Sequence, residues 1–262
     1  MKLYKFMKTI KFYKNLDEIS ENKIGLLLHF GLGDHIILNG LVNFISQRFD
    51  EVHLIIEGKL LSNLSYLYRN NKKITFHTIE NPMEADRSIN FKLLQYECEK
   101  IGNENDINFL RIGFENVGSL PFNLAFYNQV SLPYSYSFKY FLNDKNEDKD
   151  KEEILLNHLK KYYNVEKDYV LVHNESSMGP FNLNNVNTEN TIYVTKDSDI
   201  YNNLFFYRTV IKEAKEIHCL DSSFLHLVER ADTNATLFFH DLFIASVKLT
   251  KNWNYIYYYD KN

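Results

Sequence analysis

Residues 24–37 constrain the fold more than any other stretch of this 262-residue chain. An apolar run, Ile-Gly-Leu-Leu-Leu-His-Phe, ends in Gly-Leu-Gly-Asp, and a helix-like pattern begins with His-Ile-Ile. A strand that passes through a tight turn into a helix is typical of α/β proteins, which bind ligands at this point. Gly31 and Gly33 permit backbone angles and close approaches that other residues do not. Asp34 falls at the predicted helix start, where its carboxylate could either cap free N–H groups or face a ligand.

Strand-like and helix-like stretches alternate along most of the chain, which predicts parallel sheets covered by helices. The predicted strands are residues 24–30, 52–56, 74–79, 108–114, 169–173, 191–195, 216–220, 235–240 and 255–259. The predicted helices are residues 34–49, 60–68, 82–101, 204–214 and 222–231, with one more that follows the charged run 143–153 and ends at Tyr163. We therefore predict an α/β fold of two Rossmann-like halves, residues 1–125 and 151–262, joined by a linker over 126–150. Two such halves would face a central cleft lined by the carboxyl ends of their strands.

The composition excludes several classes of protein. A formal net charge of −4 gives no electrostatic basis for a nucleic-acid partner. Cys98 and Cys219 lie far apart within apolar patterns, which favours a reducing compartment over a disulfide framework. No apolar run approaches the ~20 residues that span a bilayer, and no signal peptide is recognisable, so we expect a cytoplasmic protein.

Lysines recur every third residue at the N-terminus and alternate with apolar side chains. They are Lys2, Lys5, Lys8, Lys11 and Lys14. Such a segment could make a weak peripheral contact with a membrane surface. An ordinary peripheral strand or helix with solvated lysines is the favoured interpretation.

The turn at Gly31 matches the dinucleotide-binding fingerprint only in part. Gly31 and Gly33 stand for its first two glycines, and Glu57 falls where a ribose-binding acid is expected. However, Ile36 replaces the third glycine, and Asp34 would place a negative charge beside the pyrophosphate. An NAD(P)-dependent oxidoreductase or epimerase is therefore the alternative interpretation. If Asp34 instead faces a neutral hydroxyl, it could act as a general base.

The second half carries two polar segments that directly follow predicted strands. Asp221-Ser222-Ser223 precedes a predicted helix, and hydroxyls with free N–H groups at a helix start suit phosphate oxygens. His226 follows one turn later. The other segment, after the strand 169–173, contains His173, Ser176 and Ser177. An ordinary helix cap and ordinary loop polarity would explain each segment alone, whereas their joint position at strand ends favours a phosphate or sugar site.

Asp197-Ser198-Asp199 spells the Asp-x-Asp pattern by which many sugar-nucleotide enzymes hold a divalent metal. Acids at helix starts are common, and no zinc-binding spacing occurs, so we expect no metal site.

Gly31-Leu32-Gly33-Asp34-His35 after an early strand, together with Asp221-Ser222-Ser223-x-x-His226 after a late one, resembles GT-B-fold glycosyltransferases, in particular the heptosyltransferase-like group. Phe126-Tyr127 is also similar to an interdomain segment of small members of that superfamily. The resemblance runs from about Lys23 to Trp253. It implies an enzyme of glycan biosynthesis that moves a sugar from a nucleotide-sugar donor to a hydroxyl of a glycan acceptor, with inversion and without a metal or other cofactor.

The resemblance also implies roles for individual residues. Asp34 would be the general base in an acceptor-side half, with Gly31, Gly33 and His35 in the acceptor-side turn. The donor would bind in the other half to His173, Ser176, Ser177, Lys196, Asp221, Ser222, Ser223 and His226. Met178-Gly179-Pro180 stands where such proteins often carry a cation, and Lys196, Arg208 or Lys212 could substitute for it. Because that cation is missing, a non-catalytic protein that binds a nucleotide sugar is a further alternative.

Overall fold

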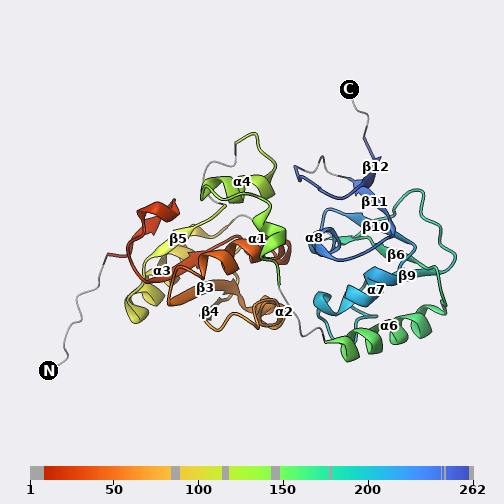
Figure 1. Ribbon diagram of the computed structural model, residues 1–262, viewed down its shortest axis with the longest axis horizontal. Helices are drawn as coiled ribbons and strands as arrows, with labels where there is room; N and C mark the ends of the chain where they lie inside the picture. The colour runs from red at the N-terminus through yellow and green to blue at the C-terminus, as the bar shows by residue number, and fades with distance from the viewer. Residues whose placement is uncertain are drawn as a thin grey trace. The chain divides into compact units, whose positions relative to one another are not determined.

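Two units, Met1–Leu142 and Asn143–Asn262, make up the computed structural model, and each has its own parallel sheet (Figure 1). The structure describes residues 9–83, 89–113, 118–142, 148–176, 179–242, 244 and 246–259. Lys2, Lys5 and Lys8 of the basic N-terminal segment lie outside these ranges. Within them, no helix is both long enough and apolar enough to cross a membrane.

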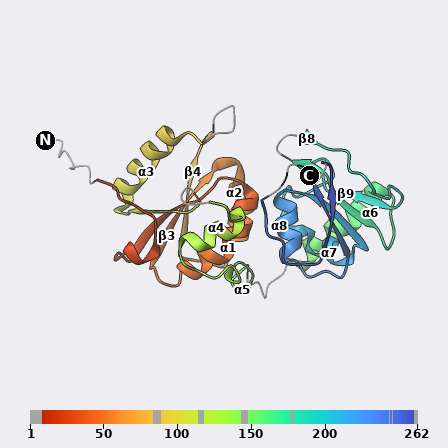
Figure 2. The ribbon, with the colours of Figure 1, turned by 90° about the horizontal axis from the view of Figure 1, so that it is seen from above.

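The sheet of the first unit has the strand order β1-β5-β2-β3-β4, and all its neighbouring strands are parallel. The strands are β1 (Phe12–Tyr13), β2 (Lys23–Leu27), β3 (Glu51–Glu57), β4 (Ile74–Ile79) and β5 (Phe109–Arg111). The helices are α1 (Leu32–Ile45), α2 (Leu61–Leu67), α3 (Phe91–Asn105), α4 (Phe122–Gln129) and α5 (Tyr136–Lys139), with short 3-10 turns at Leu16–Glu18 and Gly58–Leu60. Helix α1 packs against α2, α4 and α5 (Figure 2).

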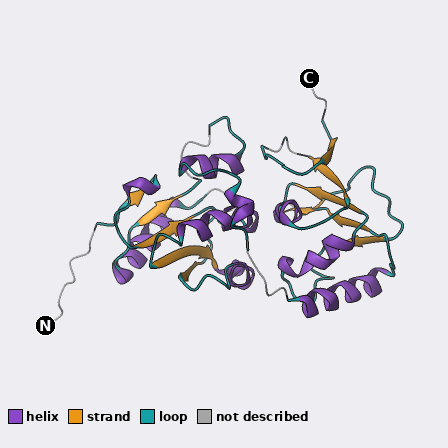
Figure 3. Ribbon diagram, in the orientation of Figure 1, coloured by secondary structure: helices purple, strands orange, loops and turns teal. Residues whose placement is uncertain are grey.

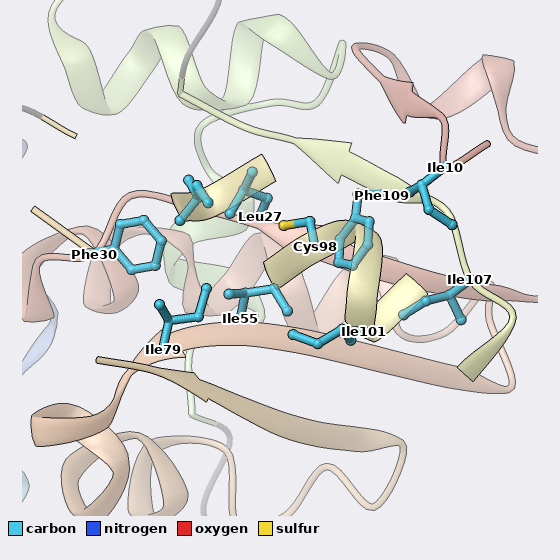
Figure 4. Close-up of a cluster of buried hydrophobic side chains, with 10 residues drawn as sticks. Ile10, Leu27, Phe30, Ile55, Ile79, Cys98, Ile101, Ile107 and Phe109 are labelled. Atoms are coloured by element: carbon cyan, nitrogen blue, oxygen red, sulfur yellow. The ribbon is translucent and has the colours of Figure 1, made fainter. Parts of the chain in front are cut away.

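The other helix of this unit, α3, covers a hydrophobic core on the sheet. Cys98 and Ile101 of α3 lie against Leu27, Ile55 and other fully or nearly fully buried side chains of the strands (Figure 4). Gly25 of β2 makes room for the ring of Phe109, because a Cβ at Gly25 would lie 2.3 Å from that ring. Strand β2 ends at Leu27, shortly before the turn that contains Gly31.

The sheet of the second unit has the order β12-β11-β10-β6-β9 and is also parallel throughout. Its strands are β6 (Val170–His173), β9 (Thr191–Tyr193), β10 (Glu216–Leu220), β11 (Thr236–Asp241) and β12 (Trp253–Tyr257). Its helices are α6 (Lys149–Tyr163), α7 (Arg208–Glu213) and α8 (Ser223–Arg230), with a 3-10 turn at Leu204–Tyr207 (Figure 3). A small antiparallel hairpin joins β7 (Glu175–Ser176) to β8 (Gly179–Pro180).

The predicted α/β class, with two parallel sheets and helices, is confirmed. The elements β1, α4, α5 and the β7–β8 hairpin were not predicted, and several predicted elements have other bounds. The helix predicted over 82–101 begins only at Phe91, because the side chain of Asn90 accepts the N–H of Leu93 at 3.0 Å and caps it there. The last strand lies two residues earlier than predicted, at Trp253–Tyr257. The first unit continues through Leu142, since α5 packs against α1 within the stretch predicted as a linker.

The close contact between α1 and α5 yields a stability prediction at Gly40. An added Cβ would lie 2.2 Å from the backbone oxygen of Tyr136, which cannot move aside as a side-chain end could. Helix propensity alone predicts that Gly40→Ala stabilises α1 by about 1 kcal/mol. We expect the opposite sign, a loss of roughly 2 kcal/mol, because overpacking a filled interface displaces backbone. Urea unfolding checks this, with Ser65→Ala on the exposed side of α2 as the control; a stabilised Gly40→Ala would contradict the packing.

Candidate functional site

The turn between β2 and α1 has ordinary backbone angles. Gly31 is the residue before the helix, with φ −74° and ψ 143°, and Gly33 lies in the first helical turn without a positive φ. What Gly31 provides is space, because a Cβ there would lie 2.7 Å from Oδ2 of Asp34. Of the two reasons for glycine that the sequence suggested at Gly31, close approach therefore applies and unusual backbone angles do not.

Asp34 is half-buried at the third position of α1. Its Oδ2 accepts the N–H of Gly31 at 3.2 Å, so the carboxylate does cap the helix start. Burial raises the pKa of the Asp34 carboxyl, while the charge of His29 and the Gly31 hydrogen bond oppose that rise. The cap uses one carboxylate oxygen, and a raised pKa is what a general base near neutral pH requires. The two roles that the sequence left open are therefore compatible.

His35 follows Asp34 but is fully buried. Burial lowers the pKa of its imidazole to about 3, so the ring is neutral. Neither ring nitrogen has a hydrogen-bond partner among the residues that the structure describes. His35 was predicted to belong to an acceptor-side turn, whereas its side chain is part of the buried core of the first unit.

The two residues that bear on dinucleotide binding also lie in defined places. Glu57 ends β3 as the fingerprint requires, but it is buried and its Oε1 lies 2.6 Å from Nζ of Lys59. Ile36 is fully buried in α1, where the fingerprint has its third glycine. Neither feature favours a pyrophosphate at this helix start.

In the second unit the structure brings His173 and Ser222 together. His173 ends β6 and Ser222 follows the adjacent strand β10, and Oγ of Ser222 lies 3.1 Å from Nδ1 of His173. Ser222 also caps α8, since its Oγ accepts the N–H of Leu225 at 3.4 Å. The His173 ring stacks on Phe224 at 5.2 Å, and burial lowers the pKa of His173 to about 4. A neutral histidine and a hydroxyl thus stand at a helix N-terminus, an arrangement that can donate hydrogen bonds to an anion.

Asp221 and His226 form a second pair at the same helix start. Nε2 of His226 lies 3.8 Å from Oδ1 of Asp221, a distance that would suit an ion pair. Burial, with a smaller contribution from Arg230, lowers the pKa of His226 to about 3, so its ring is neutral and the contact is polar rather than ionic. Arg230 itself donates from Nη1 to the carbonyl of His226 at 2.9 Å.

The remaining predicted donor residues that the structure describes lie in or beside three different elements of the second unit. Ser223 is the first residue of α8, and Ser176 lies half-buried in β7. Lys196 is exposed just beyond β9, the strand beside β6. Ser177 lies outside the described residues, as does Met178.

The Asp197-Ser198-Asp199 segment has a structural use. The carboxylate of Asp199 accepts the N–H groups of Tyr201 and Asn203 at 2.9 and 3.1 Å, which stabilises a turn. In the described part of the chain, no group of three or more His, Cys, Asp or Glu side chains could hold a metal ion.

Comparison with known proteins gives one likeness. No protein-family model and no curated protein matches the sequence. Among solved structures, a glycosyl transferase family 9 protein from Veillonella parvula DSM 2008 matches with a TM-score of 0.55 over 92% of this chain and 88% of that one. The chain shares the fold of a glycosyltransferase. Sequence identity is 8%, so the likeness concerns the fold alone.

The sequence analysis did not single out one buried acid at a strand end. Asp241 is buried at the carboxyl end of β11, next to β10, and its Oδ2 accepts the hydroxyl of Tyr259. That hydrogen bond is the main reason that the pKa of Tyr259 is raised to about 12. The predicted strand stopped at His240, which left Asp241 in an unassigned loop. An acid directly after a buried run at a strand end was the signal that could have found it.

Proposed function

We propose that this protein is a glycosyltransferase that moves a sugar from a nucleotide-sugar donor to a hydroxyl group of a glycan acceptor. The observation that carries the proposal is the position of the Asp34 carboxyl. It lies at the start of α1, after the carboxyl end of a strand in a parallel sheet, and burial raises its pKa. The fold shared with the Veillonella protein, whose title describes a glycosyl transferase, supports the same activity.

In the proposed reaction Asp34 takes the proton of the acceptor hydroxyl. The acceptor oxygen forms a bond to the anomeric carbon of the donor sugar as the bond from that carbon to the diphosphate oxygen breaks. The electron pair of the broken bond leaves with the nucleoside diphosphate. A single displacement of this kind inverts the anomeric centre, and general-base catalysis of it is worth about 10²–10⁴-fold.

The second unit would hold the donor. The N–H groups and dipole of α8, with the hydroxyls of Ser222 and Ser223, can stabilise the negative charge of a departing diphosphate. His173 would orient the Ser222 hydroxyl through their 3.1 Å contact. These groups allow the transfer to proceed without a metal or another cofactor. The proposed setting is the cytoplasm, where nucleotide sugars serve glycan biosynthesis.

A thermal-shift screen against nucleotide sugars, NAD⁺ and NADP⁺ tests this assignment. A ligand at 100 times its dissociation constant stabilises the folded state by roughly 2.7 kcal/mol, which gives a clear shift. We expect a shift with a nucleotide sugar. A shift with NAD⁺ or NADP⁺ and none with any nucleotide sugar would contradict the proposal and favour the oxidoreductase alternative.

Variants localise the ligand in the same screen. Ser222→Ala should reduce the ligand-induced shift, because it removes a hydroxyl from the proposed diphosphate site. It also removes a helix cap, which costs about 1 kcal/mol by itself. Asn90→Ala is the matched control, because it removes the cap of α3 in the first unit and should leave the ligand-induced shift intact. Donor hydrolysis and transfer assays on the same protein then separate binding from turnover.

A further inference from the structure

Glu57 is a buried acid that the proposed reaction does not use. It is the last residue of β3, and its side chain is only 10% exposed. In the register of the sheet, Leu27 at the end of β2 lies beside Ile55 of β3, so Glu57 extends two residues beyond that pair. Glu57 therefore lies at the carboxyl edge of the sheet, the edge at which β2 leads into the turn that carries Asp34.

The side chain of Glu57 lies at the rim of the apolar core that α3 covers. Successive residues of a strand alternate between the two faces of a sheet, so Glu57 shares a face with Ile55. Ile55 belongs to the buried cluster that contains Cys98 of α3, and Ile79 of β4, the register partner of Glu57, belongs to it as well (Figure 4). A carboxylate in such a place needs hydrogen-bond donors, because little water reaches it.

The two oxygens of this carboxylate differ in their partners. Oε1 of Glu57 lies 2.6 Å from Nζ of Lys59. Oε2 is buried and has no hydrogen-bond partner in the described ranges of the chain. The side chain of Lys59 is 66% exposed, and an ion pair with so mobile a partner contributes little. One oxygen therefore lacks a donor, and the other has a donor that a ligand can displace.

A second carboxylate lies close to the backbone that follows Glu57. A Cβ at Gly58 would lie 2.2 Å from Oε1 of Glu80, an exposed residue directly after β4. Carboxylates only accept hydrogen bonds, and they repel anions. This part of the sheet edge therefore favours a ligand that offers hydrogen-bond donors, such as the hydroxyls of a sugar, over a phosphate.

We propose that Glu57 binds the acceptor sugar, with its carboxylate accepting hydrogen bonds from hydroxyls other than the one that reacts at Asp34. An acid at the equivalent strand end of dinucleotide-binding folds holds a ribose hydroxyl, and the same chemistry serves any sugar. Such a contact gives the unpartnered oxygen the donor that it lacks. This inference rests on the proposed function, because it assigns a sugar to the acceptor side of the transfer.

A comparison of transfer with donor hydrolysis tests the assignment, because water replaces the acceptor sugar in hydrolysis. The acceptor probe is a methyl glycoside chosen from a panel of methyl hexosides. In Glu57→Gln, which keeps the side-chain volume, we expect the KM for this probe to rise about 10- to 100-fold. The kcat of transfer and the rate of donor hydrolysis should stay within about two-fold of wild type. Glu51→Gln, at the exposed first position of β3, is the control and should leave this KM unchanged.

Monodeoxy analogues of the probe identify the hydroxyl that Glu57 binds. For the analogue that lacks this hydroxyl, the wild-type KM should rise by a similar factor, and Glu57→Gln should add no further rise. Glu57→Asp keeps the charge but withdraws the carboxylate by one methylene, so it should also raise the KM. It replaces Glu57→Gln in the comparison if that variant does not fold.

An unchanged KM in the Glu57 variants would overturn the inference and leave the proposed function standing. An equal loss of hydrolysis and transfer would also overturn it, because that result shows a structural role. The same holds if Glu57→Gln abolishes a thermal shift with NAD⁺, which would make Glu57 the ribose-binding acid of an oxidoreductase. If the wild-type protein neither hydrolyses a nucleotide sugar nor transfers from one, the proposed function fails, and the assignment of Glu57 fails with it.

Discussion

Lowering the pH from 7 to 5 is expected to unfold the second unit. Three of its histidines, His173, His226 and His240, are buried with their pKa values lowered to about 4, 3 and 4. Histidines in the unfolded chain take up protons near pH 6.5. Between that pH and about 4, the unfolded state therefore binds three more protons than the folded state.

Proton linkage gives the direction and the size of the change in the free energy of unfolding with pH. Each such histidine contributes stability that is present above pH 6.5 and is lost as the pH falls toward the pKa of the folded state. One pH unit costs about 1.4 kcal/mol for each group, so three groups give a slope of about 4 kcal/mol per pH unit. Over 1.5 units this approaches the whole stability of a typical domain. The carboxyl of Asp199, whose pKa is raised by burial, acts against this trend.

The single tryptophan of the chain makes the measurement direct. Trp253 is buried in β12, where its Nε1 donates to Glu229 at 2.6 Å, so its fluorescence reports on the second unit. Urea unfolding at several pH values gives the slope. His226→Leu should reduce the slope by about a third. A free energy of unfolding that stays constant between pH 7 and 5 would contradict the neutral, buried state of these histidines.

Local patterns were sufficient to predict most of the secondary structure. Ile74–Ile79 and Glu216–Leu220 coincide with their predicted strands, because apolar runs bounded by polar turns leave little choice of boundary. The N-cap at Ser222 was also predictable, since a hydroxyl directly precedes an amphipathic helix.

Contacts between distant parts of the sequence could not be predicted in this way. Nε2 of His29 lies 2.7 Å from the carbonyl oxygen of Gly113, 84 positions away, and no local sequence pattern links the two residues. Glu229 is similar: it is buried in α8 and accepts hydrogen bonds from Thr250 Oγ1 at 2.6 Å and from Trp253. In the sequence it looks like an ordinary helix-surface acid. Burial of His35 was missed for the same reason, because the pattern gives the helix but not which face the neighbouring helices cover.

The substitution Asp34→Asn should reduce sugar transfer by about 10²–10⁴-fold, the contribution expected of a general base. The amide oxygen of asparagine can still accept the Gly31 N–H, so the helix cap and the fold should persist. Donor binding should also persist, because the proposed donor residues belong to the second unit. Asp17→Asn is the matched control, since Asp17 is an exposed acid in the first turn of a short helix of the same unit.

The most direct test of the account is therefore the turnover of purified Asp34→Asn with a donor that the thermal-shift screen has identified. We predict an unchanged donor-induced shift together with a loss of transfer of at least about 100-fold, while Asp17→Asn retains full activity. Transfer by Asp34→Asn at the wild-type rate would contradict the assignment of Asp34 as the base.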